Sequence, residues 1–308
     1  MTEHTDQVLN ALRQAPQFAQ VTTFDSITRL GGLTNLVHRV DFRGSSVIVR
    51  ISGAGTEDYI DRAVEGNNAC AAASAGVAPE VIFVHPQTGL MITQTVPDVV
   101  TMTPALFKSR AGSSARAGAA LAKLHRSGEV FQYRFELFAK IDDYLKILST
   151  KDVELPAGYD GVVAAATPIK DVLAQATIPL SPCHCDPLCE NFLDSGSIMW
   201  IVDWEYSGMN DPLWDLGDLS VEAGMDAGQD AALMQAYFGR APTASETGRM
   251  VIYKAMCDLL WTLWGLIQHA DNNPADDFWA YATGRFERCR SLMNAPEFQG
   301  HIAAVRKG

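Results

Sequence analysis

The first third of the chain consists of short apolar runs of strand length, separated by turns that contain glycine. Runs of about four to eight residues rich in Val and Ile and bounded by turn residues are typical of β-strands. Such runs lie at 37–42, 46–51, 81–84 and 90–94. Arg43-Gly44-Ser45 has the composition of a tight hairpin turn, and the alanine-rich stretch 58–76 predicts a helix that ends at Gly76. The pattern therefore predicts a small antiparallel sheet that carries a helix.

After Pro97 the apolar residues recur with helical spacing. Helices are expected near 104–127, 134–149, 160–176, 212–238, 245–270 and 275–293. The segment 188–204 interrupts this pattern, because two short apolar runs flank Asp194-Ser-Gly-Ser197 and predict a β-hairpin. We expect an α+β protein with two lobes: a small antiparallel-sheet lobe over 1–96 and a larger, mostly helical lobe over 97–308.

Composition and charge narrow the class of protein. The chain has 308 residues, of which 47% are hydrophobic and 19% charged, as in ordinary globular proteins. Its formal net charge of -12 disfavours nucleic acid and anionic membranes as partners, whereas a cationic small molecule would be tolerated. The N-terminus lacks the pattern of a signal peptide, and the apolar run 259–270 is shorter than the about 20 residues that span a bilayer. The six cysteines indicate no disulfide framework, so a cytoplasmic location is expected.

The most informative residues lie around the predicted hairpin, in His184-Cys-Asp-Pro-Leu-Cys-Glu-Asn191 and in Asp203 after the next strand. Phosphoryl transfer requires a carboxylate that receives the proton of the substrate hydroxyl, and oxygen ligands that hold Mg²⁺ against the phosphates. Asp186, Asn191 and Asp203 supply these groups, since the hairpin folds Asp203 back toward Asn191. The alternative is that the Asp and Asn side chains only cap turns. The apolar strand that ends in Asp203 favours the chemical interpretation.

These residues resemble the HxDxxxxN catalytic loop and the following DxE sequence of the choline/ethanolamine kinase family, within the aminoglycoside-phosphotransferase and protein-kinase-like superfamily. His184, Asp186, Asn191, Asp203 and Glu205 match position by position. The resemblance implies a two-lobed protein-kinase-like fold with ATP and Mg²⁺ as cofactors. It also implies Asp186 as the base, Asn191 and Asp203 as metal ligands, Glu205 as a metal group reached through water, and His184 as a structural residue of the loop. Cys185 departs from the Asn often found at its position.

The same resemblance extends to the nucleotide-binding residues. Leu30-Gly-Gly-Leu-Thr-Asn35 resembles the family's short nucleotide loop, although a glycine pair alone is only a turn signal. Arg50 corresponds to the cation that pairs with the phosphates, with Glu65 as the carboxylate that positions it. Alone, Arg50 would be interpreted as a solvated charge at a strand end. The stretch around Gln94 resembles the hinge, whose backbone would contact adenine. The implied nucleotide-binding residues are Gly32, Thr34, Asn35, Arg50, Glu65 and Gln94.

The C-terminal aromatic residues bear on the substrate. Trp261 and Trp264 share one helix face, and Phe278 and Tyr281 repeat the same spacing. A quaternary ammonium has no N–H donors, so it is held by ring faces at about 2 kcal/mol per desolvated contact, with a carboxylate nearby. WxxW followed by FxxYxxxRF resembles the choline-kinase tail, which implies Glu222 as that carboxylate. The alternative is a pair of helices with an aromatic core and a surface glutamate.

The sequence therefore predicts an ATP- and Mg²⁺-dependent kinase that phosphorylates choline or a related amino alcohol, with Asp215 as a structural support of the catalytic loop. Ethanolamine, thiamine and aminoglycosides remain alternative substrates, a pseudokinase that only binds nucleotide or choline remains an alternative function, and a homodimer remains open. A zinc site at Cys183, His184, Cys185 and Cys189 is disfavoured, because no CxxC pair is present and adjacent side chains do not converge on a tetrahedral metal.

Overall fold

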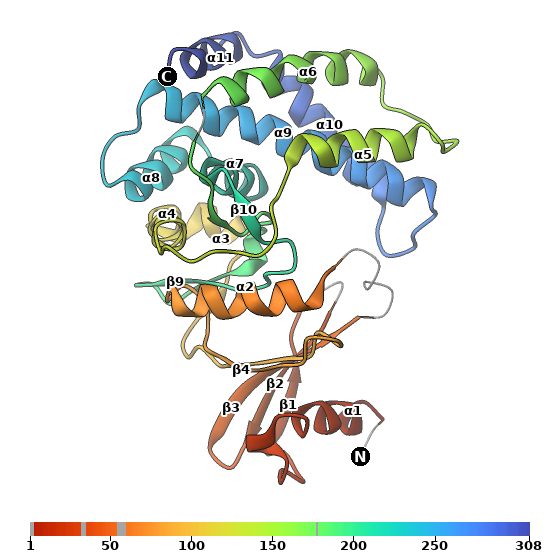
Figure 1. The fold of residues 1–308 in the computed structure, drawn as a ribbon, viewed down its shortest axis with the longest axis vertical. Helices are drawn as coiled ribbons and strands as arrows, with labels where there is room; N and C mark the ends of the chain where they lie inside the picture. The colour runs from red at the N-terminus through yellow and green to blue at the C-terminus, as the bar shows by residue number, and fades with distance from the viewer. Residues whose placement is uncertain (1–2, 32–34, 54–59, 177) are drawn as a thin grey trace.

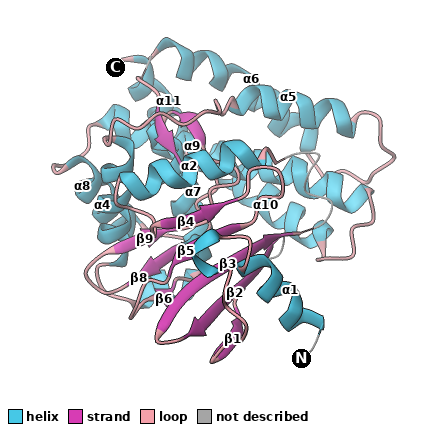
Figure 2. Cartoon of the chain, turned by 60° about the horizontal axis from the view of Figure 1, so that its bottom comes forward, coloured by secondary structure: helices cyan, strands magenta, loops and turns pink. Residues whose placement is uncertain are grey.

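The computed structural model describes residues 3–31, 35–53, 60–176 and 178–308. A small sheet lies at one end of the molecule, a layered group of helices lies at the other, and α2 runs between them (Figure 1). This arrangement is the α+β, two-lobed fold expected from the sequence. Figure 2 shows the sheet from another side, with α1 beside its strands.

The larger sheet is antiparallel throughout, with the strand order β1-β2-β3-β5-β4. Its strands are β1 (Ser26–Arg29), β2 (Asn35–Phe42), β3 (Ser45–Ser52), β4 (Val81–Val84) and β5 (Met91–Gln94). Arg43 and Gly44 both have positive φ, 50° and 74°, which is the conformation of the two-residue turns that match the twist of paired strands. The helix α1 (Glu3–Leu12) and the 3-10 turn η1 (Pro16–Phe18) precede the sheet and were not predicted. The side chains of Val8 and Leu12 pack into the apolar core of this lobe.

The helix α2 (Arg62–Ser74) carries charged residues at its start and apolar residues further along. It begins at Arg62 because the Asp61 side chain accepts hydrogen bonds from the backbone N–H groups of Ala63 and Val64 in the first turn. The predicted start at 58 falls within 54–59, which lie outside the described residues. Ala69 and Ala72 are buried in the same apolar cluster as Phe107 and Leu121 of the helical lobe. The apolar face of α2 thus belongs to the larger core.

The helical lobe contains the predicted helices with several changes in their boundaries. Its described helices are α3 (Pro104–Ser109), α4 (Ser113–His125), α5 (Leu137–Leu148), α6 (Tyr159–Gln175), α7 (Pro212–Ala223), α8 (Ala227–Phe238), α9 (Ala244–Ala270), α10 (Phe278–Met293) and α11 (Phe298–Arg306). The prediction of single helices over 104–127 and 212–238 is wrong. Gly112 and Gly224 have φ values of 73° and 57°, so each of these stretches is broken at a glycine in the left-handed region. The sequence analysis did not predict α11.

The long helix α9 forms the centre of this lobe. By length and composition it could cross a membrane, but 78% of its most apolar window is buried inside the fold. It begins at a capping box, in which Thr243 and Glu246 each accept a hydrogen bond from the other's backbone N–H. Its apolar residues are therefore accounted for by core packing.

Two small sheets connect the helical lobe to the candidate site. The first pairs β7 (Ser181–Cys183) with β10 (Gly208–Asn210), and the second contains β6 (Val100–Thr101), β8 (Phe192–Asp194) and β9 (Met199–Ile201) in the order β6-β8-β9. The predicted hairpin is β8 and β9. Asp194 is fully buried at its turn, where Arg110 and Arg116 each donate to its carboxylate at 2.5 Å. Burial alone would raise the pKa of Asp194, but the hydrogen bonds from Arg116 and Gly196 help to lower it to about 2.

Close helix packing gives a first testable prediction. A Cβ atom on Gly118 of α4 would lie 2.2 Å from the backbone oxygen of Leu233 in α8. Gly118→Ala must therefore push the two helices apart, and we expect a loss of about 1–3 kcal/mol in the free energy of unfolding. Gly161→Ala in α6 is the matched control, because its Cβ would meet nothing within 4 Å. Urea unfolding of both variants is the measurement, and equal stabilities would contradict the close approach.

Candidate active site

The candidate catalytic residues lie on the loop between β7 and β8. Asp186 is half-buried at the start of this loop, and the 3-10 turn η2 (Cys189–Asn191) ends it. The Asn191 side-chain nitrogen donates to the Asp186 backbone oxygen at 3.1 Å, which closes the loop on itself. The Val202 N–H donates to the Asn191 carbonyl at 2.9 Å, so the residue before Asp203 is fixed to the residue that ends the loop. The hairpin thus returns the chain to the catalytic loop, as its pattern predicts.

Two residues of the site have left-handed backbone conformations, which residues other than glycine rarely adopt. Cys185 has a φ of 68° and Asp203 a φ of 70°. Asn and Asp tolerate the left-handed region better than other residues with side chains, which is a physical reason for the Asn often found at the position of Cys185. The Cys185 carbonyl accepts a hydrogen bond from Trp214 Nε1 at 3.1 Å, and its thiol is fully buried. The surrounding contacts therefore hold Cys185 in this conformation.

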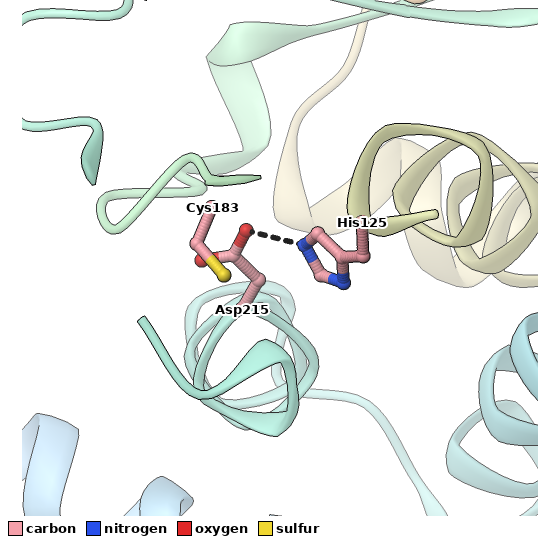
Figure 3. Close-up of side chains that lie close together, drawn as sticks. All are labelled: His125, Cys183 and Asp215. Carbon is pink, nitrogen blue, oxygen red and sulfur yellow. Dashed lines mark hydrogen bonds and ion pairs between the residues drawn. The ribbon is translucent and has the colours of Figure 1, made fainter. Parts of the chain in front are cut away.

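Asp215 supports the catalytic loop from the first turn of α7. Its carboxylate accepts hydrogen bonds from the N–H groups of His184 and Cys185 at 2.7 and 2.9 Å. Nε2 of His125, at the end of α4, lies 3.0 Å from the same carboxylate (Figure 3). The other ring nitrogen of His125 lies 3.0 Å from the Tyr237 hydroxyl. Three helices and the loop are joined by this buried network, which fits the structural role predicted for Asp215.

His125, Cys183 and Asp215 also have potential metal-ligand atoms within 4.8 Å of one another (Figure 3). These atoms already take part in hydrogen bonds within the protein. His125 and Asp215 contact each other, and the Cys183 thiol donates to the Asn210 carbonyl at 3.6 Å. Burial, and next the Asp215 carboxylate, raise the pKa of Cys183 well above its usual range. A thiol that keeps its proton is a poor metal ligand. The contacts favour a packing role for this cluster.

His184 links the loop to the strand before Asp203. Its Nε2 lies 2.9 Å from the Val202 carbonyl, and its ring centre lies 4.9 Å from that of Trp204. A carbonyl only accepts hydrogen bonds, so Nε2 carries the proton. This side chain is fully buried and forms no hydrogen bond with Asp186 among the described residues. Its position fits the structural role predicted for it.

Arg50 contacts acids from both lobes. Its guanidinium forms an ion pair with Glu65 of α2, and its second terminal nitrogen lies 3.7 Å from Asp203 and 3.4 Å from Glu205. Burial lowers the pKa of Arg50, but the acids outweigh this and raise it. The predicted phosphate-binding cation therefore lies beside the predicted metal-binding carboxylate. Asp203, Glu205 and Glu65 place oxygen atoms within 4.8 Å of one another.

Glu205 has a larger role between the lobes than the sequence indicated. Its carboxylate accepts a hydrogen bond from Asn35 at 3.1 Å and lies 3.6 Å from Arg62. Arg62 also donates to Glu65 at 2.8 Å, so it bridges the two acids. Burial, followed by the charge of Asp203, raises the pKa of Glu205 to about 7. Sequence reasoning missed Arg62, although its place three residues before Glu65 on one helix face was a usable signal.

The other residues predicted to bind nucleotide are Gly32, Thr34 and Gln94. Gly32 and Thr34 lie outside the described residues. The Gln94 side chain is exposed and donates to Glu80 at 2.5 Å. The Gln94 backbone N–H donates to the Glu80 carbonyl at 2.9 Å, so this donor is used within the sheet lobe.

The four predicted aromatic residues come together, but they pack against one another. The ring centre of Trp264 lies 5.9 Å from Trp261, 5.4 Å from Phe278 and 5.7 Å from Tyr281, all edge to face. The Arg285 guanidinium lies 4.7 Å from the centre of the Tyr281 ring. A cation of the protein itself therefore lies over one of the ring faces predicted for the substrate.

Glu222 is an ion-paired residue in this region. Its carboxylate lies 2.5 Å from Arg285, and only 11% of its side chain is exposed. Burial raises the pKa of Asp186 well above its usual range, and the charges of Glu222 and Asp203 raise it further. Asp186 thus lies in the electrostatic field of two predicted groups, the metal-binding and the substrate-binding acid. A carboxyl group with a raised pKa is suited to accept a proton near neutral pH.

A small antiparallel sheet beside a helical lobe, with the loop of Asp186 and Asn191 at their junction, is the architecture of the protein-kinase-like phosphotransferases. Within this class, the family model for choline/ethanolamine kinase matches residues 27–238. The chain belongs to the choline/ethanolamine kinase family, and it is a phosphotransferase that binds nucleotide and acts on an alcohol group.

Related proteins match most of the chain. A crystal structure of a choline/ethanolamine kinase family protein from Mesorhizobium loti is 59% identical, with a TM-score of 0.92 over 99% of both chains. Choline kinase LicA from Streptococcus pneumoniae is 26% identical, with a TM-score of 0.72 over 88% of this chain and 94% of that one. Ethanolamine kinase 2 of Mus musculus is 26% identical over 79% of this chain and 68% of its own length.

Proposed function

We propose that the protein transfers the γ-phosphate of ATP to the hydroxyl group of choline or of a related small amino alcohol. The observation that carries this proposal is the loop of Asp186, which is closed by Asn191 and joined to the residue before Asp203. The charges of Glu222 and Asp203 also act on Asp186, so a substrate that carries positive charge would be attracted toward this base. Relatives named for choline and for ethanolamine support this substrate class.

In this proposal, Asp186 orients the substrate hydroxyl and accepts its proton as the oxygen attacks the phosphorus. Asn191 and Asp203 would hold Mg²⁺, with Glu205 acting through water. The donor set fits, because Mg²⁺ prefers oxygen ligands and Asp203 Oδ1 is a buried oxygen without a hydrogen-bond partner among the described residues. When bound, Mg²⁺ would offset charge on the β and γ phosphates.

The sheet lobe, residues 1–96, would bind the nucleotide, and residues 97–308 would supply the catalytic loop and the substrate pocket. Arg50, held by Glu65, would pair with the phosphates, and Asn35 would contribute with Gly32 and Thr34 from the loop before β2. The backbone around Gln94 would contact adenine. Because Arg50 also lies near Asp203 and Glu205, the phosphates would compete with these acids for its guanidinium.

An ADP-release assay on a panel of alcohols tests the proposal. The purified protein is supplied with ATP, Mg²⁺ and choline, ethanolamine, thiamine or an aminoglycoside, and phosphorylated product is identified by mass. We expect turnover with an amino alcohol. Turnover only with thiamine or an aminoglycoside would refute the substrate class, and an inactive protein that still binds choline and nucleotide would establish the pseudokinase alternative.

Two tryptophan variants test whether Trp264 binds the substrate or only packs in the core. Trp264 contacts Phe278 and Tyr281, so Trp264→Ala should raise the KM for choline by about tenfold or more, since a desolvated cation–π contact contributes about 2 kcal/mol. The KM for ATP should change little. Trp279→Ala is the matched control, because this half-buried tryptophan contacts His269 instead. Equal increases in both KM values for Trp264→Ala would indicate a packing role.

A further inference from the structure

An acidic residue that the sequence analysis did not identify lies beside the candidate substrate residues. Asp218 follows Asp215 by three residues and precedes Glu222 by four, so all three lie along one face of α7. Asp218 is fully buried, and its Oδ1 accepts a hydrogen bond from the Cys257 thiol of α9 at 3.2 Å. Its other oxygen, Oδ2, has no hydrogen-bond partner in the part of the chain that the structure describes.

Asp218 is close to the residues expected to meet the substrate. The ligand atoms of Asp218, Glu222 and Cys257 lie within 4.8 Å of one another. Trp261 follows Cys257 by four residues and therefore lies on the same face of α9. The Nε1 donor of Trp261 is also buried without an acceptor among the described residues. The facing sides of α7 and α9 thus hold a buried acceptor and a buried donor that no described side chain satisfies.

The ion pairs around Asp218 leave negative charge uncompensated. Glu222 is paired with Arg285 at 2.5 Å, and Asp258 is paired with Arg288 at 2.5 Å. Arg285 also lies 3.4 Å from Asp258, so its charge is shared by Glu222 and Asp258. Neither Asp186 nor Asp218 forms a salt bridge with any described basic residue. A ligand that brings a positive charge would therefore improve the charge balance of this region.

We propose that Asp218 is a specificity-determining residue that favours substrates whose cationic group carries N–H donors; this inference rests on the proposed function. A primary ammonium has three N–H groups and can donate to Asp218 Oδ2, whereas a quaternary ammonium has none. Leaving a buried acceptor unpaired carries a free-energy cost. The two headgroups therefore differ in whether they donate a hydrogen bond to Asp218 Oδ2. Glu222 lies beside Asp218, with a carboxylate oxygen within 4.8 Å of it, and 11% of its side chain is exposed.

The electrostatics of Asp218 support the same role. Burial, followed by the charges of Glu222 and Asp186, raises its pKa well above the usual range. A cation bound beside Asp218 would favour the charged form of this carboxyl group and strengthen the hydrogen bond that it accepts. Arg285 opposes the raised pKa but is paired with Glu222 and does not reach Asp218 within salt-bridge distance.

A substrate series with increasing N-methylation tests the proposal. The values of kcat/KM are measured for ethanolamine, its N-methyl and N,N-dimethyl derivatives and choline, with the parent enzyme and with Asp218→Asn. We expect the variant to lose about 10- to 100-fold with ethanolamine, the usual effect of a buried hydrogen bond to a charged group. The loss should shrink with each methyl group and be smallest for choline. All four substrates are measured with the same preparation of a variant, so a lower folded fraction cancels from the ratio of kcat/KM between two substrates.

Asp230→Asn is the matched control, since Asp230 is half-buried and paired with Lys254 at 2.8 Å, and it is outside the acid cluster. This variant should keep the parent's ratio of kcat/KM for ethanolamine to kcat/KM for choline. A parent that turns over amino alcohols, together with an Asp218→Asn loss equal for all four substrates, would overturn the inference and leave the proposed function standing. A parent inactive toward the whole series would refute both.

Discussion

Asp186→Asn is expected to lower kcat by about 10²- to 10⁴-fold, the range that a positioned general base contributes. The amide keeps the shape of the side chain but cannot accept the hydroxyl proton. The loss should fall on kcat rather than on nucleotide affinity, because Asp186 is predicted to contact the alcohol and not the nucleotide. Steady-state ADP release and nucleotide titration by calorimetry measure the two quantities separately.

The Asp186 variant should remain folded. Burial and two neighbouring acids disfavour the charged carboxylate, so its replacement removes unfavourable electrostatic energy. The control is Glu190→Gln in the same loop, because Glu190 is exposed and its amide should leave kcat unchanged. If Asp186→Asn kept the kcat of the parent, Asp186 would not be the base, whatever the effect on substrate binding.

Asp203→Asn is expected to lower kcat/KM by about 10²- to 10³-fold, as does the loss of one group that stabilises transition-state charge. It should also raise the Mg²⁺ concentration needed for half-maximal activity, because an amide oxygen is a weaker ligand than a carboxylate. Asn is the appropriate replacement, since it tolerates the φ of 70° at this position. Activity measured over a range of Mg²⁺ concentrations gives both values.

Asp98→Asn is a control with the same chemical change and a similar backbone. Asp98 has a φ of 53° and is exposed near the joint between the lobes. Its replacement should change neither kcat/KM nor the requirement for Mg²⁺. If Asp203→Asn showed the same Mg²⁺ dependence as the parent, Asp203 would not be a metal ligand. The family membership would be unaffected.

The features that the sequence predicted correctly depend on neighbours in the chain. The hairpin around Asp194 is an example, because two apolar runs and a turn sequence are enough to indicate it. The loop that contains Asp186 and Asn191 is another, because it closes on itself with a local hydrogen bond. The helix breaks at Gly112 and Gly224 had local signals too, but helical periodicity continues across them and concealed the left-handed turns.

The features that were missed depend on residues far apart in the sequence. Nothing near Glu222 indicates that Arg285, on another helix, pairs with it and covers a ring face of Tyr281. Asp218 resembles an ordinary polar residue of a helix until the packing of α7 against α9 buries it beside Cys257. Pair formation and burial are properties of the tertiary fold, so periodicity and composition do not reveal them.

The placement of α2 limits how this protein could be recombined with its relatives. Ala69 and Ala72 belong to the core of the helical lobe, while Glu65 on the same helix holds Arg50 of the sheet. A chimera joined at residue 97 would pair a foreign α2 with the native core and lose complementary packing there. A crossover just before Asp61 would keep that packing, but it would divide the sheet between β3 and β5. The new boundary would therefore need a compatible β3–β5 pairing as well as compatible charges around Arg50. Domain shuffling in this fold should therefore treat α2 as part of the larger module.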